Sequence, residues 1–240
     1  MRLEDLLKEV PELENYIRYM PEELYKRHTI RVYPPGTIIH QKDYPLTSFG
    51  IIAKGEHRVI NEFENGNVYM IEKNEPIDFV GEVTILAGME KTSVTIETLT
   101  ETTVIYFSRK DFEEWIRKDI HFLRLVSNKI AYKLYRSSYN RGARLFYPPH
   151  FILLDYILKQ ADSMNISDTK EILIRKTRQE LYEECGITVK TINRTIKKLL
   201  EDGVISLRKG KISMNLEQYH LARKVIHHYV RLTSRTPVQE

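Results

Sequence analysis

Hydrophobic and polar residues follow distinct patterns along the chain, and each pattern predicts a different kind of structure. Residues 1–27 place apolar side chains at helical spacing in short pieces, which predicts a helical lead-in. From Thr29 to Phe107 the sequence changes to short β-rich runs cut by turn residues. Strands at this spacing predict a β-sandwich or barrel. The Asn65-Gly66 step predicts a hairpin with a type I′ turn, because both residues accept a positive φ.

A regular apolar repeat follows the β-rich segment. Residues 109–141 contain no Gly or Pro, and apolar or small side chains recur at alternating spacings of four and three from Ile116 to Ser137. This heptad pattern predicts one long helix, which either packs on its own barrel or pairs with a second copy of the chain. We expect a parallel homodimer whose seam contains Ile120, Leu123, Ile130 and Leu134.

A hinge is predicted after this helix. Gly142 and the Pro148-Pro149 pair disfavour a continuing helix, so we place the hinge at residues 142–149. Beyond the hinge, the pattern predicts a helix near residues 151–161 and a short β run at residues 172–174.

Two capped helices are predicted next. Thr177 and Glu180 stand at capping-box spacing, in which the hydroxyl caps the helix and the carboxylate reaches back to a free amide. That short helix should stop near Cys185-Gly186, and Thr188 can cap a second helix running to about Glu201. The spacing is that of a helix-turn-helix, although an ordinary pair of packed helices would have the same pattern.

The second helix has one apolar and one polar face. Ile192, Ile196 and Leu199 should face inward at helical period. A hairpin over residues 204–214 with a basic tip at residues 208–211 follows, as in the wing of a winged helix. The side chains left on the outer face are of the types that bind bases and phosphates: Lys190, Asn193, Arg194 and Lys197.

Composition excludes several classes of protein. The chain has 240 residues, of which 42% are hydrophobic and 29% charged, as in globular proteins and unlike disordered or collagen-like chains. No apolar run approaches the roughly 20 residues that span a bilayer. Acidic residues stand near the start, where a signal peptide would be apolar, so we expect a cytoplasmic protein. The one cysteine, Cys185, excludes an intrachain disulfide and an all-cysteine metal site.

The net charge of +4 hides an uneven distribution. Residues 1–108 hold 11 Lys and Arg against 18 Asp and Glu, whereas residues 109–240 hold 26 against 15. The second half therefore favours a polyanionic partner such as nucleic acid, although a charge run is often only a solvated face.

The β-rich segment with Gly81-Glu82, the long helix, the hinge and the Thr177-Arg178-Gln179-Glu180 helix start resemble the Crp/Fnr family of bacterial transcription regulators. The resemblance covers about residues 28–214. It implies an α+β fold: an N-terminal double-stranded β-helix (β-roll) of the cyclic-nucleotide-binding type, a long dimerisation helix and a C-terminal winged helix-turn-helix. The expected domains are a sensor at 1–108, the dimer helix at 109–141, the hinge at 142–149 and a DNA-binding domain at 150–240, with an extra C-terminal helix.

The resemblance also implies an effector pocket in the roll. Where family members that bind cyclic AMP have Gly-Glu, Arg-Ser and Thr-Ser pairs, this chain has Gly81-Glu82, Thr92-Ser93 and Ser137-Ser138. The phosphate-binding arginine is missing, and Lys91 beside it should point away if Thr92 points in. Backbone amides after Glu82 could still hold an anion. We expect an effector other than cyclic AMP.

No metal or cofactor is expected. The eight histidines show no metal-ligand spacing except the adjacent pair His227-His228, which lies outside the matched region, so we expect neither haem nor an iron–sulfur cluster. The resemblance implies other partners: a palindromic DNA duplex, a second copy of the chain, RNA polymerase and an unidentified small effector.

The resemblance assigns roles on the DNA. Better-known members of the family have an Arg-Glu pair where this chain has Val189-Lys190. Lys190 and Arg194 should therefore read guanines, and Val189 should touch a thymine methyl. Arg194 could instead pair with Glu201 or Glu180. Phosphates should be held by Thr177, Arg178, Thr191 and Lys209, while Thr188 begins the helix.

Two other interpretations remain at this point. The protein could be a regulator without a ligand, controlled by its abundance or by a partner protein at the acidic roll. It could also be an enzyme with a cupin-like pocket, which would need a cluster of inward-facing histidines and carboxylates that the sequence does not show.

Overall fold

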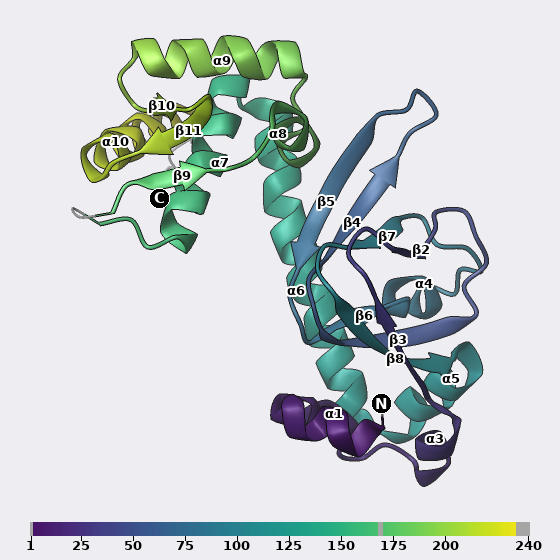
Figure 1. The fold of residues 1–240 in the computed structure, drawn as a ribbon. Helices are drawn as coiled ribbons and strands as arrows, with labels where there is room; N and C mark the ends of the chain where they lie inside the picture. Colours follow the sequence, from purple (N-terminus) through teal and green to yellow (C-terminus); the bar gives the residue numbers. More distant parts are fainter. Residues whose placement is uncertain (1, 168–169, 234–240) are drawn as a thin grey trace, which may run out of the picture. The chain divides into compact units, whose positions relative to one another are not determined.

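The computed structural model describes residues 2–167 and 170–233, without the side chains of residues 136, 139–146 and 228–233 (Figure 1). The chain divides into two compact units between Ser138 and Tyr139. The first holds the β-rich segment and the second the predicted DNA-binding helices. The helix α6, Ile120–Phe146, runs across the boundary.

Two four-stranded antiparallel sheets form the β-roll of the first unit. One has the order β1-β8-β3-β6 and the other β2-β7-β4-β5. A small apolar core, which includes Ile52, Val59 and Val104, lies between them. The strands are β1 (Thr29–Tyr33), β2 (Ile38–His40), β3 (Ser48–Lys54), β4 (His57–Glu62), β5 (Val68–Asn74), β6 (Asp78–Val80), β7 (Thr95–Thr98) and β8 (Thr102–Ser108).

Helices pack on the other face of the first sheet. Phe49 of β3 stacks on Phe112 at 4.0 Å between ring centroids, and Trp115 stacks on Phe122 of α6 at 3.8 Å. All four rings are fully buried, so they fix the start of α6 against the roll. These helices are α1 (Leu3–Glu9), a 3₁₀ turn at Pro11–Leu13, α2 (Glu14–Ile17), α3 (Glu22–Arg27) and α5 (Arg109–Lys118).

The predicted single helix over residues 109–141 is wrong, because α5 and α6 are separate. Asp119 between them has extended backbone angles. Its Oδ1 accepts a hydrogen bond of 2.9 Å from the Phe122 amide, and its Oδ2 accepts one of 3.0 Å from the Trp115 indole. Asp119 therefore caps the start of α6. The predicted helix end at Gly142 is wrong as well, because α6 continues to Phe146.

The Asn65-Gly66 hairpin forms between β4 and β5, but its predicted type I′ turn does not. Gly66 has φ +77°, whereas Asn65 is not among the residues with positive φ. The loop spans residues 63–67 and is closed by hydrogen bonds of 2.9 Å from the Gly66 amide to the Phe63 carbonyl and from the Phe63 amide to the Asn67 carbonyl. A longer loop of this kind needs positive φ only at the glycine.

The second unit is a winged helix-turn-helix. A three-stranded antiparallel sheet, β10-β11-β9, stands beside the helices. A core of aliphatic side chains such as Leu154, Leu181 and Ile192 joins them. The elements are α7 (Pro149–Ser163), β9 (Ile172–Ile174), α8 (Arg178–Cys185), α9 (Val189–Glu201), β10 (Ser206–Arg208), β11 (Lys211–Met214) and α10 (Leu216–Thr233). The last is the expected extra helix; residues 234–240 lie outside the described part.

Candidate functional site

A cavity of about 70 Å³ lies in the roll beside α4 (Glu82–Leu86). Three predicted pocket residues line it: Gly81, Glu82 and Thr92. Ser93 and Ser138 are exposed and Ser137 is half-buried, and none of the three lines the cavity. The lining consists of His40, Val59, Glu72, Phe79, Gly81, Glu82, Val83, Thr84, Thr92, Val94, Ile96 and Lys133.

Gly81 is required by the backbone at the entrance to α4. Its φ is +91°, which side chains rarely adopt, and a Cβ there would lie 2.9 Å from the Ser48 carbonyl oxygen and 3.4 Å from Cε1 of His40. The glycine of the Gly-Glu pair is therefore explained by the turn geometry alone.

Four buried polar side chains join the cavity wall to α6. The Lys133 ammonium lies 3.1 Å from Oε1 of Glu82 and 2.9 Å from Oδ1 of Asp78. The other Asp78 oxygen lies 3.2 Å from Nε2 of His57. Both contacts of Asp78 are ion contacts by distance, without the angles of a hydrogen bond. Side-chain exposure is 15% for Lys133 and at most 4% for the other three, so these charges are compensated by one another rather than by solvent.

Burial and pairing act against each other in this group. Burial raises the pKa of the Glu82 carboxyl, although Lys133 acts in the opposite direction. Burial would also raise the pKa of Asp78, but the adjacent His57 and Lys133 outweigh it, and the pKa lies below its ordinary value. Burial would lower the pKa of Lys133, and the two carboxylates raise it above its ordinary value. Lys133 and Asp78 are therefore charged at neutral pH.

Thr92 occupies the position at which the resemblance implied an arginine. It is 4% exposed, and its hydroxyl donates 3.1 Å to the Val94 carbonyl. Lys91 is exposed and outside the cavity lining, as expected, although residues 91 and 92 precede β7 and do not lie in a strand. Among the lining residues, Lys133 is the one side chain with a permanent positive charge.

Four polar residues of this region were not predicted. Lys133 had a usable signal, because it falls on the inward helical face that Phe122 and Val126 define. The sequence held no comparable signal for His40, Asp78 and Glu72, because the residues near them in space come from distant strands.

The exposed face of α6 carries large apolar side chains. Ile120 is 78% exposed, Leu134 63% and Tyr135 79%. Leu123 and Ile130 are half-buried, and Ile130 packs against the roll core. Of the four predicted seam residues, Ile120 and Leu134 are therefore the most available to another chain.

The predicted caps of α8 and α9 are confirmed. The Thr177 hydroxyl accepts from the Glu180 amide at 3.1 Å, and the Thr177 amide donates to the Glu180 carboxylate at 2.7 Å. Gly186 ends α8 with φ +69°, and the Thr188 hydroxyl accepts from the Thr191 amide at 3.3 Å. These contacts set the start of each helix at the predicted residue.

The outer face of α9 is basic and free of internal partners at its centre. Ile192, Ile196 and Leu199 are buried, as predicted. Within the described part of the chain, Lys190 and Arg194 make no hydrogen bond or ion pair. The alternative partners of Arg194 are engaged elsewhere, because Glu201 lies 3.9 Å from Lys197 and Glu180 belongs to the capping box. Lys190, Asn193, Arg194 and Lys197 are exposed, while Val189 and Thr191 are half-buried.

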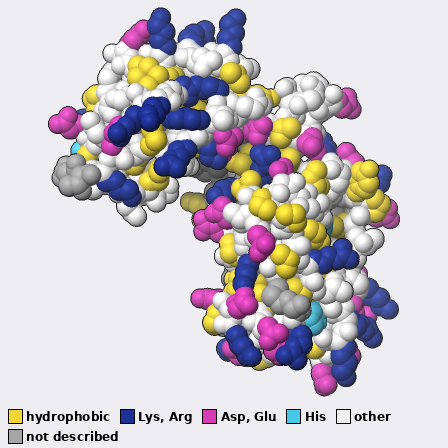
Figure 2. All heavy atoms as spheres, viewed as in Figure 1, with side chains coloured by type: hydrophobic (Ala, Val, Ile, Leu, Met, Phe, Trp, Pro, Cys, Tyr) yellow, Lys and Arg dark blue, Asp and Glu magenta, His cyan; other side chains and the backbone are white. Residues whose placement is uncertain are grey.

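The wing ends in a two-residue turn with positive φ at both positions, +49° at Lys209 and +75° at Gly210. Lys209 is exposed and has no partner within the described residues. Its neighbours are engaged: Arg208 lies 3.6 Å from Glu171, and Lys211 donates 3.2 Å to the Lys176 carbonyl. Figure 2 shows Lys and Arg side chains gathered on the visible face of the second unit.

Arg178 joins the start of α8 to the wing. Its guanidinium donates 3.4 Å to the Gly210 carbonyl, which leaves further N–H groups of this half-buried side chain for another acceptor.

Both units match families of known proteins. Residues 30–119 match the cyclic nucleotide-binding domain family, and residues 175–206 match the winged helix-turn-helix DNA-binding family. The chain is 28% identical over 181 residues to the cAMP-activated global transcriptional regulator CRP of Salmonella typhimurium, covering 74% of this chain and 85% of that protein. The chain belongs to the Crp/Fnr family of transcription regulators. It is a DNA-binding regulator with a cyclic-nucleotide-binding-type domain.

Two further proteins resemble this Crp/Fnr regulator. The cAMP-activated global transcriptional regulator Vfr of Pseudomonas aeruginosa is 27% identical over 202 residues, covering 81% of this chain and 92% of that protein. The structure of the c-di-GMP-responsive global regulator CLP of Xanthomonas campestris matches with a TM-score of 0.67 at 17% identity, covering 81% of this chain and 97% of that chain. The second likeness shows the fold alone.

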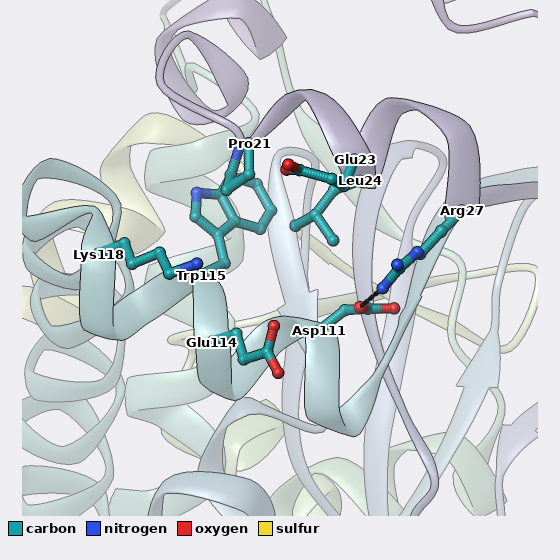
Figure 3. Close-up of a pocket in the computed structure, with 8 residues that line it drawn as sticks. All are labelled: Pro21, Glu23, Leu24, Arg27, Asp111, Glu114, Trp115 and Lys118. Atoms are coloured by element: carbon teal, nitrogen blue, oxygen red, sulfur yellow. Dashed lines mark hydrogen bonds and ion pairs between the residues drawn. The ribbon is translucent and has the colours of Figure 1, made fainter.

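The Crp/Fnr regulator has another hollow, of about 200 Å³, between α3 and α5 (Figure 3). Arg27 and Asp111 pair at 3.2 Å on its wall, and Glu23, Glu114 and Lys118 complete a rim of mixed charge. Trp115, which also lines it, is fully buried. With both signs of charge and no exposed aromatic surface, this hollow favours no class of ligand.

Neither a metal cluster nor a membrane span is found in residues 2–167 and 170–233. No group of three or more His, Cys, Asp or Glu side chains there could hold a metal ion. None of the helices searched combines the length and the hydropathy of a bilayer-crossing segment.

Proposed function

We propose that this Crp/Fnr regulator acts as a homodimer that binds a palindromic DNA site, with α9 of each copy in a major groove. The observation that carries the proposal is the outer face of α9, where Lys190 and Arg194 are exposed and have no partner among the residues that the structure describes. An unpaired arginine on a recognition helix is available for a bidentate contact to guanine.

The basic residues divide into two groups. Lys190 and Arg194 read guanines, Val189 touches a thymine methyl, and Asn193 and Lys197 flank them on the exposed face. Thr177, Arg178, Thr191 and Lys209 hold phosphates. The wing supports this division, because Lys209 has no hydrogen-bond or ion-pair partner among the described residues, whereas Arg208 lies beside Glu171.

A second copy of the chain covers the exposed face of α6. Large apolar side chains that are about two-thirds exposed or more, such as Ile120, Leu134 and Tyr135, are costly to leave in water at one surface. Pairing of two α6 helices would bury them. In such a dimer we expect the two α9 helices to bind successive major grooves, which lie roughly 34 Å apart.

The roll senses a small effector and passes the signal through α6. Lys133 supports this coupling, because it places an α6 side chain in the cavity wall in contact with Glu82. A ligand that changes this contact can shift α6 between two arrangements, provided that it binds one of them more tightly. RNA polymerase is the further protein partner that the family resemblance suggests.

A second candidate is a regulator that needs no effector. The same contact favours it: with Lys133 against Glu82 and Asp78, the buried charges compensate one another without a ligand. A partner protein at the acidic roll would then control activity.

Duplex binding tests the proposal directly. A palindrome selected from random DNA should bind the purified protein at least about a thousandfold more tightly than a scrambled duplex at physiological salt. Sedimentation of the complex should give two chains per duplex. Equal affinity for the two duplexes would contradict sequence-specific binding, and one chain per duplex would contradict the dimer.

A further inference from the structure

The roll cavity contains carboxylates but no uncommitted cation. Glu72 and Glu82 line it, and Asp78 adjoins it through Lys133. Lys133 is the one permanent cation among the described lining residues, and it is already paired with the buried carboxylates of Glu82 and Asp78. An anionic ligand would therefore lose its hydration without gaining a partner of opposite charge.

His40 points to a ligand that donates hydrogen bonds. Its side chain lines the cavity, is 9% exposed, and makes no hydrogen bond within the described part of the chain. Burial lowers its pKa to about 4, so the ring is neutral at physiological pH and has one acceptor nitrogen. Since this nitrogen has no protein partner among the described residues, it is available to a donor in the cavity.

Thr92 also lines the cavity, but its hydroxyl is engaged by its own chain segment. It donates 3.1 Å to the Val94 carbonyl and accepts 3.4 Å from the Val94 amide. Apart from Thr84, the rest of the wall is apolar, with side chains such as Val59, Phe79 and Ile96. These groups suit a molecule with a positively charged donor at one end and a short aliphatic part.

The cavity is also small. A cavity of roughly 150 Å³ holds a six-carbon ring, so one of about 70 Å³ has room for about three non-hydrogen atoms. Pockets for drug-sized ligands begin at roughly 300 Å³, which excludes a cyclic nucleotide from this cavity as it stands.

We propose that the roll cavity binds a small aliphatic ammonium ion, with its charge between Glu72 and Glu82 and an N–H group on His40. This inference rests on the proposed role of the roll as the effector domain. The ligand class is a primary amine of about three non-hydrogen atoms, protonated at neutral pH.

Three compounds of similar size and different charge test the ligand class. Ethylammonium chloride, ethanol and sodium acetate are titrated into the full-length protein at constant ionic strength, with binding followed by saturation-transfer NMR. We expect a Kd of about 1 mM for ethylammonium, near the limit for so few atoms, and at least about tenfold weaker binding of the other two. Acetate binding as tightly as ethylammonium, or no saturable ethylammonium binding at tens of millimolar, would overturn the proposal.

Variants of His40 test the site. His40→Leu should weaken ethylammonium binding about fivefold, the factor of one neutral hydrogen bond, whereas His40→Gln retains an acceptor oxygen and should stay within about twofold of wild type. His220→Gln, an exposed change on α10, is the control and should have no effect. Equal affinity of the Leu and Gln variants would place the ammonium elsewhere.

The same samples separate this inference from the proposed DNA-binding function. Each is titrated with the selected palindrome in the absence of amine. A protein that binds the palindrome and not ethylammonium overturns the ligand and leaves DNA binding intact, and the converse result overturns DNA binding alone.

Discussion

Lys133 of α6 donates a hydrogen bond of 3.1 Å to the carboxylate of Glu82 at the start of α4. Since the same ammonium lies 2.9 Å from Asp78, one helical side chain compensates two buried negative charges of the roll. A change at residue 133 therefore affects the stability of the roll and the position of α6 together.

Replacing Lys133 with Met should destabilise the first unit by about 3 kcal/mol, because it leaves both carboxylates buried without a cation. The fluorescence of Trp115, the one tryptophan in the sequence, reports this unit during urea unfolding. Glu82→Gln added to Lys133→Met should recover part of the loss. Arg124→Met, an exposed change on the same helix, should cost less than about 0.5 kcal/mol. Equal losses for the two single variants would mean that the ion contacts do not stabilise the roll.

Stability of the first unit should fall between neutral pH and pH 5. Burial lowers the pKa of His40 from 6.5 to about 4, so between these values the unfolded chain binds a proton that the folded protein does not. The folded state loses about 2 kcal/mol from this group between pH 7 and pH 5.

The variant His40→Gln tests that pH dependence. The variant has no titrating ring at residue 40. The decrease in its free energy of unfolding between pH 7 and pH 5 should therefore be about 2 kcal/mol smaller than the decrease in wild type. Urea unfolding of both proteins at the two pH values gives the comparison. The same pH dependence in both would mean that His40 titrates normally.

Dimer formation should depend on Leu134 more than on residues of the roll-facing side of α6. Leu134 is 63% exposed in the single chain, so Leu134→Glu should leave folding intact and give monomers by analytical ultracentrifugation. Asn128→Glu, also exposed on α6, should remain dimeric. A wild-type protein that is monomeric at tens of micromolar, or a dimeric Leu134→Glu, would contradict the α6 interface.

Lys209 at the wing tip should contribute affinity without selectivity. Lys209→Ala is expected to weaken binding to all duplexes alike and to lower the slope of log affinity against log salt by about 1. Arg208→Ala is the matched control, since its guanidinium is 3.6 Å from Glu171 and is less available to phosphate. A loss confined to the selected palindrome would instead make Lys209 a base contact.

The helix-turn-helix was the most predictable part of the molecule, because its boundaries depend on local chemistry. Thr177 and Glu180 cap one helix, Gly186 ends it and Thr188 begins the next, and each of these contacts spans at most four residues. The inward period of Ile192, Ile196 and Leu199 is equally local.

Element ends set by competing local preferences were predicted less well. Gly142 lowers helix propensity by only about 1 kcal/mol, and α6 continues through it and stops before the Pro148-Pro149 pair. Asp119 interrupts the predicted helix because its carboxylate accepts from both the Phe122 amide and the Trp115 indole. Neither Gly nor Pro marks that break.

The polar wall of the cavity could not be predicted from the sequence. His57 and Asp78 lie 21 positions apart and meet only when β4 and β6 are in their sheets, and Lys133 reaches them from 55 positions further on. The family resemblance pointed to Gly81, Glu82 and Thr92. The residues that set the charge of the cavity come together only through contacts between segments that are distant in the sequence.

Selection of binding sites from random DNA tests the central claim, that α9 reads the bases, most directly. Wild type, Arg194→Ala and the control Lys197→Ala, whose residue lies beside Glu201, are each used to select duplexes. We expect wild type to select a palindrome. Arg194→Ala should select the same palindrome with one guanine per half-site no longer specified, and should lose about 1–3 kcal/mol of binding free energy on the wild-type site. Lys197→Ala should keep every position. An unchanged palindrome with the same information at every position for Arg194→Ala would show that Arg194 reads no base, and would contradict the recognition face assigned to α9.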